Sequence, residues 1–106
     1  MYDMNHMKRL GKLTDLAPDA FKAFQDFDKK ALAEGAIPAK TKSMLAIAVA
    51  LTTQCSYCIE VHRRRAVKAG VTEQELAEIA MVATALNAGA AIAHASHLFP
   101  DAQPHP

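Results

Sequence analysis

The segment CSYCIEVHRRRAVKAG, residues 55–70, contains both cysteines of the chain and reads as one complete helix. Gly70 is well placed to end it, because glycine adopts the left-handed backbone that commonly terminates helices. At about 100° per residue, Cys58 lies about 60° around the helix from Cys55, and His62 about 40° from Cys58. The three side chains therefore share one face, and His62 is better placed to serve Cys58 than Cys55.

Helical patterns flank this segment on both sides. Residues 18–35 begin with Pro18, and residues 38–54 begin with Pro38 and stay apolar to residue 51. Residues 72–87 begin with Thr72 and Glu75 at the spacing of a capping box, and a separate last helix is expected after residue 91. The first of these helices carries an apolar stripe that we expect to be buried: Phe21, Phe24, Phe27, Ala31 and Leu32.

No stretch alternates with a period of two. We therefore predict an all-α fold, a compact bundle of about five to six helices. The 106 residues are expected to form a single domain, with a core over residues of about 20–98.

Composition excludes several classes of protein. The net charge of +1 does not suggest binding to nucleic acid. The N-terminus lacks the apolar run of a signal peptide. The longest apolar run, residues 44–51, is far shorter than the roughly 20 residues that span a bilayer. We expect a soluble, cytoplasmic protein without a membrane partner, and in that compartment a CxxC pair is typically catalytic or metal-binding.

Two predicted helices are apolar on nearly every side, MLAIAVAL at residues 44–51 and AEIAMVATALNAGAAIAHA at residues 77–95. One small chain has too little structure to cover both. We predict a homo-oligomer in which alanine and glycine allow close helix contacts between subunits. The alternative is that the first helix and the chain termini cover them.

The cysteine pair suits thiol chemistry. Free N–H groups and the positive end of the dipole at a helix N-terminus favour thiolate over thiol. An imidazole such as that of His62 can accept and return a proton. Cys55 and Cys58 can then cycle between dithiol and disulfide, one sulfur attacking and the other resolving. Position at the helix tip favours Cys55 as the attacking residue, whereas nearness to His62 favours Cys58.

The cysteine pair has three other interpretations: a structural disulfide, a zinc site, or two buried cysteines without a chemical role. A structural disulfide across so short a loop stabilises little, about 2 kcal/mol. A zinc site of Cys55, Cys58 and His62 needs a fourth ligand, for which His94 or His97 is the candidate, and lacks the usual second pair. A pair of buried cysteines without a chemical role fits poorly with the helix face that Cys55 and Cys58 share with His62. No metal or organic cofactor is required, because the sulfurs themselves carry the electrons.

Residues 39–95, with their CxxC-x3-H element, the KAGVT turn and the alanine-rich helix that follows, resemble the alkylhydroperoxidase D-like branch of the carboxymuconolactone decarboxylase family. The resemblance implies an all-α fold assembled as trimers or hexamers. It also implies that the CxxC reduces peroxides or exchanges disulfides, with Cys55 and Cys58 as redox cysteines and His62 as proton relay.

Two positions depart from the family pattern. The branch usually has a glutamate twelve residues before the first cysteine, where this chain has Ser43. The residue before the second cysteine is histidine in the best-studied members and commonly tyrosine in smaller relatives, and here it is Tyr57. Serine can hydrogen-bond an imidazole but cannot stabilise imidazolium as a carboxylate does. Glu34, or Glu60 of another chain, is a conceivable substitute. We expect a slower relay, which the substitution Ser43→Glu should accelerate.

The predicted function is that of a thiol-dependent peroxidase or thiol–disulfide oxidoreductase, an antioxidant enzyme of peroxiredoxin type. Its substrate would be a hydroperoxide or a disulfide, and its reductant a dithiol or a redox partner protein. Two alternatives remain, a decarboxylase-like lyase with His62 as base and a non-catalytic metal-binding module. The basic cluster Arg63, Arg64, Arg65 and Lys68 is expected to be a solvated face or a set of ion pairs between subunits, with an anion-attracting rim as the alternative. His6 and His105 are expected in loosely ordered ends.

Overall fold

The computed structural model describes residues 2–101, and over that range the chain contains helices and no strand. In order these are η1 (Met4–Leu10), α1 (Gly11–Leu16), α2 (Pro18–Ala31), α3 (Ala39–Thr53), α4 (Ser56–Lys68), α5 (Glu73–Ala95) and η2 (Ser96–Leu98). The prediction of an all-α fold is confirmed. His105 lies outside the described residues.

The helix boundaries follow from local chemistry. Pro38 precedes α3 as its N-cap. Gly70, just after α4, has a φ of 95°, a conformation that suits glycine. Thr72 caps α5, and its hydroxyl accepts the Glu75 N–H while the Glu75 carboxylate accepts the Thr72 N–H. The predicted capping box is therefore present.

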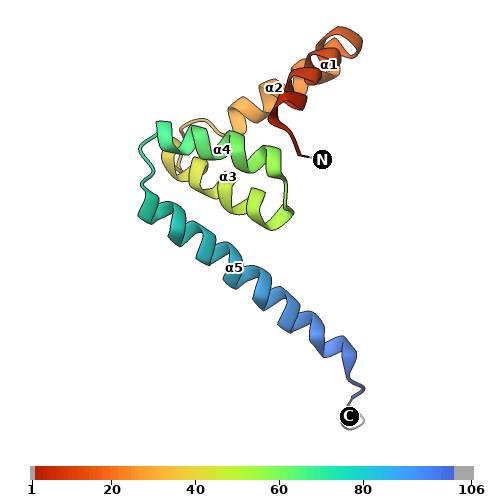
Figure 1. Cartoon of the computed structure of the whole chain (residues 1–106), viewed down its shortest axis with the longest axis vertical. Helices are drawn as coiled ribbons and strands as arrows, with labels where there is room; N and C mark the ends of the chain where they lie inside the picture. Colours follow the sequence, from red (N-terminus) through yellow and green to blue (C-terminus); the bar gives the residue numbers. More distant parts are fainter. Residues whose placement is uncertain (1, 102–106) are drawn as a thin grey trace.

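The core lies where α3, α4 and the first half of α5 meet. Ile47 of α3, Ala66 of α4, Val71 of the α4–α5 turn and Ile79 of α5 form one buried cluster. Figure 1 shows α3 and α4 side by side, with α5 starting beside them and running away. Burial of these apolar groups is the main term that holds the three helices together.

The rest of the chain is more open than the compact bundle we expected. The helices α1 and α2 pack on each other as an arm at one end, and the last turns of α5 project from the other (Figure 1). The radius of gyration is 18.7 Å, against about 13 Å for a compact chain of this length. The prediction that the apolar stripe of α2 is buried is wrong for the single chain, since the side chain of Phe24 is 59% and that of Phe27 69% exposed.

The helix α5 is longer than predicted. The expected break after Asn87 is absent, and one helix continues to Ala95 through Gly89. Within residues 2–101 the stretch Glu73–Leu98 is the one segment long and apolar enough to cross a membrane by length and composition alone. Its first half packs on α3 and buries Ile79 and Ala83.

Candidate functional site

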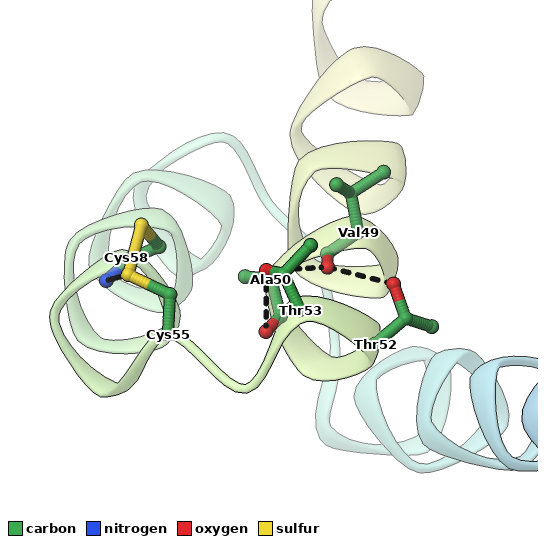
Figure 2. Close-up of a disulfide and its surroundings, with 6 residues drawn as sticks. All are labelled: Val49, Ala50, Thr52, Thr53, Cys55 and Cys58. Atoms are coloured by element: carbon green, nitrogen blue, oxygen red, sulfur yellow. Dashed lines mark hydrogen bonds between the residues drawn. A yellow bond between two sulfur atoms is a disulfide. The ribbon is translucent and has the colours of Figure 1, made fainter.

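The turn between α3 and α4 places the two cysteines. Gln54 ends α3 in the left-handed conformation, with a φ of 57°, which turns the chain sharply into α4. The hydroxyls of Thr52 and Thr53 donate to the carbonyl of Val49 at 2.8 and 3.0 Å and satisfy the last turn of α3 (Figure 2). Cys55 is then the N-cap of α4.

Cys55 and Cys58 are joined by a disulfide at this helix tip, with Cα atoms 5.2 Å apart (Figure 2). The Sγ atom of Cys55 also accepts the backbone N–H of Cys58 at 3.2 Å. The sulfurs therefore lie at the positive end of the α4 dipole, as the helical spacing predicts. The pair has the geometry that a dithiol–disulfide cycle requires.

Cys58 and His62 line the same pocket, of about 490 Å³, between α2, α3 and α4. Cys55 is not among the residues that line it. The other walls are largely apolar and come from α2, α3 and the loop between them: Ala31, Leu32, Ile37, Leu45, Ala46, Val49 and Ala50. The pocket thus gives an apolar molecule access to Cys58 and the imidazole together.

The environment of His62 favours its neutral form. Partial burial lowers the pKa of the imidazole below its ordinary value, and the guanidinium of Arg65 lowers that pKa further. The carboxylate of Asp28 acts in the opposite direction and raises it. A neutral imidazole beside Cys58 is able to accept the thiol proton.

The candidate carboxylates and Ser43 are engaged elsewhere. The hydroxyl of Ser43 donates to the carbonyl of Ala39 in its own helix at 3.2 Å, and Ser43 does not line the pocket. Glu34 accepts the backbone N–H of Ala39 at the start of α3. Glu60 accepts from Arg63 and Arg64, each at 3.0 Å, and these hydrogen bonds lower its pKa. None of the three lines the pocket that contains His62.

Tyr57 is covered by the N-terminal segment. Its hydroxyl lies 3.4 Å from the backbone N of Asp3, which donates to it, and 3.3 Å from Nδ1 of His6. The ring of Tyr2 packs edge-on against that of Tyr57, with centroids 5.1 Å apart. The expectation that His6 lies in a loosely ordered end is wrong, since the segment packs against the residue between the cysteines.

The remaining polar candidates lie away from the cysteines or are paired. Arg63, Arg64 and Arg65 form ion pairs within the chain, with Glu60 and Asp28, whereas ion pairs between subunits stay a prediction. His94 and His97 contact each other at the far end of α5, with ring centroids 5.9 Å apart. Within residues 2–101, no three His, Cys, Asp or Glu side chains are grouped so that they would hold a metal ion. The zinc site with His94 or His97 is therefore not assembled within one chain.

Asp28 is the pocket residue that sequence reasoning missed. It lines the pocket from α2, opposite His62. A signal was present, because Asp28 follows Phe21 by seven residues and Phe24 by four and so lies on the apolar face of the helix. A carboxylate on an apolar face is unusual and indicates a specific partner.

The sequence of the chain is similar to those of known proteins. The sequence profile of the carboxymuconolactone decarboxylase family matches residues 18–100. A protein of Paracoccus denitrificans described as uncharacterized protein 4 in the cox locus is 39% identical over 82% of this chain and 78% of its own length. An uncharacterized protein of Cupriavidus necator is 30% identical over 84% of this chain and 79% of its own.

Two crystal structures share the fold. A protein from Methanobacterium thermoautotrophicum superposes with a TM-score of 0.77 and 34% identity, over 83% of this chain and 98% of that one. The apo form of a carboxymuconolactone decarboxylase family protein from Legionella pneumophila superposes with a TM-score of 0.75 and 29% identity, over 87% and 82%.

Proposed function

Because the chain belongs to the carboxymuconolactone decarboxylase family, we propose that it is a thiol-dependent peroxidase of the alkylhydroperoxidase D-like branch. The observation that carries this proposal is that Cys58, already bonded to Cys55, shares an apolar pocket with a neutral imidazole. The apolar walls suit an organic hydroperoxide better than a highly polar substrate. The roles proposed for Cys55, Cys58 and His62 rest on the geometry of this chain, because the two sequence relatives are described as uncharacterized.

The reaction would begin from the reduced pair. His62 accepts the proton of the Cys58 thiol, and the thiolate attacks the distal oxygen of the hydroperoxide. The O–O bond breaks, the sulfur becomes a sulfenic acid, and the leaving alkoxide takes the proton from the imidazolium to form an alcohol. The Cys55 thiol then loses its proton as its sulfur attacks the sulfenic sulfur, so that the disulfide forms and the leaving hydroxide takes up that proton as water.

A dithiol closes the cycle. It reduces the Cys55–Cys58 disulfide by two successive thiol exchanges and is itself oxidised to a disulfide. The hydroperoxide thus receives the two electrons that the dithiol loses. The same exchange chemistry would allow a disulfide of a partner protein to be the substrate, and the reductant is a small dithiol or a redox partner protein.

The test is a thiol titration of reduced protein before and after addition of an alkyl hydroperoxide, followed by mass mapping of the peptide that joins Cys55 to Cys58. We expect two thiols to be lost per chain as one equivalent of alcohol appears. The variant Cys58→Ser should consume no peroxide, because the sulfur in the pocket is missing. The variant Cys55→Ser should consume one equivalent and retain a sulfenic acid that a dimedone probe labels.

Two outcomes would refute the proposal. One is a reduced pair that survives excess hydroperoxide with both thiols titratable. The other is a lyase activity on a lactone-like acid that persists in the double variant Cys55→Ser, Cys58→Ser, which would favour the decarboxylase alternative.

We also propose that the chain functions as a homo-oligomer, a trimer or a hexamer. Its accessible surface is 8,496 Å², whereas a compact monomer of 11.4 kDa exposes about 5,800 Å². Large apolar side chains are exposed on α3 and α5: Leu45, Val49, Met81, Val82, Leu86 and Ile92. Contacts between copies would cover these side chains. A cytoplasmic location remains a prediction from the sequence.

A further inference from the structure

The last turn of α2 is anchored over the candidate pocket. The ammonium of Lys42, on α3, donates to the carbonyls of Ala31 at 3.0 Å and Ala33 at 2.7 Å. These carbonyls belong to the end of α2 and the residues just after it, where no helical partner is available. Lys42 therefore ties the arm to the core at the point where Leu32 and Asp28 line the pocket.

Asp28 lies in this anchored part of α2 and faces α4 across the pocket. Its Oδ2 is 4.0 Å from Nη1 of Arg65, which follows His62 by three residues on the same helix and so lies on a neighbouring face. The side chain of Asp28 is 43% exposed, so its carboxylate keeps access to water while one side of it faces the pocket.

The charged groups around His62 come from three helices. They are Asp28 from α2, Lys42 from α3 and Arg65 from α4. Without Asp28, an imidazolium formed at His62 would lie near the Arg65 guanidinium, with no carboxylate among the residues that line the pocket. Proton transfer from the Cys58 thiol creates that imidazolium, so a carboxylate at this place lowers the energy of the charged intermediate.

We propose that Asp28 is the positioning residue for His62, the carboxylate that replaces the glutamate expected at position 43. The effect of Asp28 on turnover rests on the proposed peroxidase function. Its effect on the protonation of His62 does not. Asp28 stabilises the protonated imidazole when His62 holds the proton of the Cys58 thiol. Ser43, Glu34 and Glu60 do not compete for this role, since each is hydrogen-bonded elsewhere and none of them lines the pocket that contains Asp28 and His62.

The first experiment follows the titration of the His62 imidazole by NMR in the oxidised full-length protein, where no cysteine thiol titrates. The variant His62→Gln assigns the signal. We expect Asp28→Asn to move the His62 titration to lower pH, because an opposing negative charge is lost. The matched control is Asp26→Asn, on the same helix but bonded to Lys22 at 3.2 Å, which should leave the titration unmoved.

The second experiment measures peroxide turnover of the same proteins as a function of pH. Asp28→Asn should lower kcat about tenfold, a part of the roughly 10²–10⁴-fold that a positioned acid–base group contributes, with little change in KM. It should also move the acidic limb of the rate profile to lower pH. Asp28→Glu should restore both quantities toward wild type, because it keeps the carboxylate.

The outcomes separate this inference from the proposed function. An unmoved His62 titration in folded Asp28→Asn protein overturns the role of Asp28, even if the wild type reduces peroxides. A shifted titration supports the electrostatic pairing even in a chain that reduces no peroxide, and then the proposed function alone fails. A shift of the same size in Asp26→Asn would also overturn the inference, since it would show a long-range charge effect.

Discussion

His62 lies under opposing electrostatic influences, and their balance decides what it can do. Burial and Arg65 lower the pKa of the imidazole, while Asp28 raises it. A base works best when its pKa is near the working pH, because it is then both unprotonated and able to hold a proton briefly. The arrangement keeps His62 neutral before reaction while giving it a counter-charge when it becomes imidazolium.

The lowered pKa of His62 predicts a pH dependence of stability. The folded pKa lies below the unfolded value of about 6.5, so the unfolded chain binds more protons between these two values. The contribution of neutral His62 is thus fully present above about pH 6.5 and is lost as the pH falls toward the folded pKa. Urea unfolding at about pH 7.5 and about pH 5.5 should show a smaller loss of stability for His62→Gln than for wild type.

The control for this effect is His94→Gln, since His94 is exposed at the far end of α5. That variant should keep the wild-type pH dependence. Equal losses for wild type and His62→Gln would contradict the assignment of the titrating group.

Ser43→Glu tests whether α3 can supply a second carboxylate. Ser43 precedes Ala46 by three residues and Ala50 by seven, and both alanines line the pocket, so a longer side chain at position 43 starts from the correct face. We expect peroxide turnover to rise, with a larger gain in the Asp28→Asn background. The measurement is kcat at neutral pH for Ser43→Glu against the uncharged Ser43→Gln, and an equal rise in both would show that charge is not the cause.

At the scale of single elements, the short turn between α3 and α4 does most to create the site. Thr52 and Thr53 close the end of α3, Gln54 reverses the chain, and Cys55 begins the next helix with its own side chain as cap. The Cys55 sulfur accepts the N–H of Cys58, one of the backbone donors that a helix N-terminus leaves unpaired. The two sulfurs are consequently held at the junction of α3 and α4.

The capping box of α5 predicts a measurable cost for its loss. Thr72→Ala removes the hydroxyl that accepts the Glu75 N–H at 3.1 Å, so the free energy of unfolding should fall by about 1 kcal/mol. Thr84→Ala is the matched control, because the Thr84 hydroxyl donates to the Ala80 carbonyl within the helix and adds little to it. Chemical denaturation at one protein concentration measures both, and equal effects would contradict the capping role.

Local signals in the sequence predicted most helix starts, but they did not predict the packing between helices that are far apart in the sequence. Pro38, Gly70 and Thr72 act within a few residues, so their effects can be read from the chain itself. The continuous path of α5 through Gly89 was missed because one glycine costs only about 1 kcal/mol in an otherwise strong alanine-rich helix. The place of Asp28 depends on how α2 docks on α3, which no local pattern specifies.

The whole molecule exposes apolar surface that a stable monomer would bury. The projecting end of α5 carries Leu86 at 65% and Ile92 at 76% exposure, and the arm carries Phe27 at 69%. Over residues 2–101, the alternative that the first helix and the chain termini cover the apolar faces is wrong for the single chain, because Leu45, Val49 and Val82 on those faces stay exposed. Self-association is the simplest way to remove this surface from water.

Light scattering coupled to size exclusion should therefore give a mass of three or six chains. The thermal midpoint should also rise with protein concentration, because assembly stabilises the folded state by mass action. A monomer mass with a midpoint independent of concentration would contradict the proposed assembly.

Gly89→Leu places a bulky side chain on the exposed half of α5. Nothing lies within 4 Å of a Cβ atom at this position in the single chain, and leucine favours helix over glycine by nearly 1 kcal/mol. If copies pack closely there, the variant should form smaller assemblies while its helix content, measured by circular dichroism, is kept. Unchanged assembly would place the contact elsewhere on α5.

Cys55 is both the N-cap of α4 and half of the proposed redox pair, so reduction of the disulfide also changes how tightly that helix begins. A thiolate carries more negative charge than a disulfide sulfur and is a stronger acceptor for the Cys58 N–H. The amide of Cys58 should then exchange with deuterium more slowly when the pair is reduced at a pH that favours thiolate. The fraying of the first turn of α4 would therefore depend on whether the cysteine pair is oxidised or reduced.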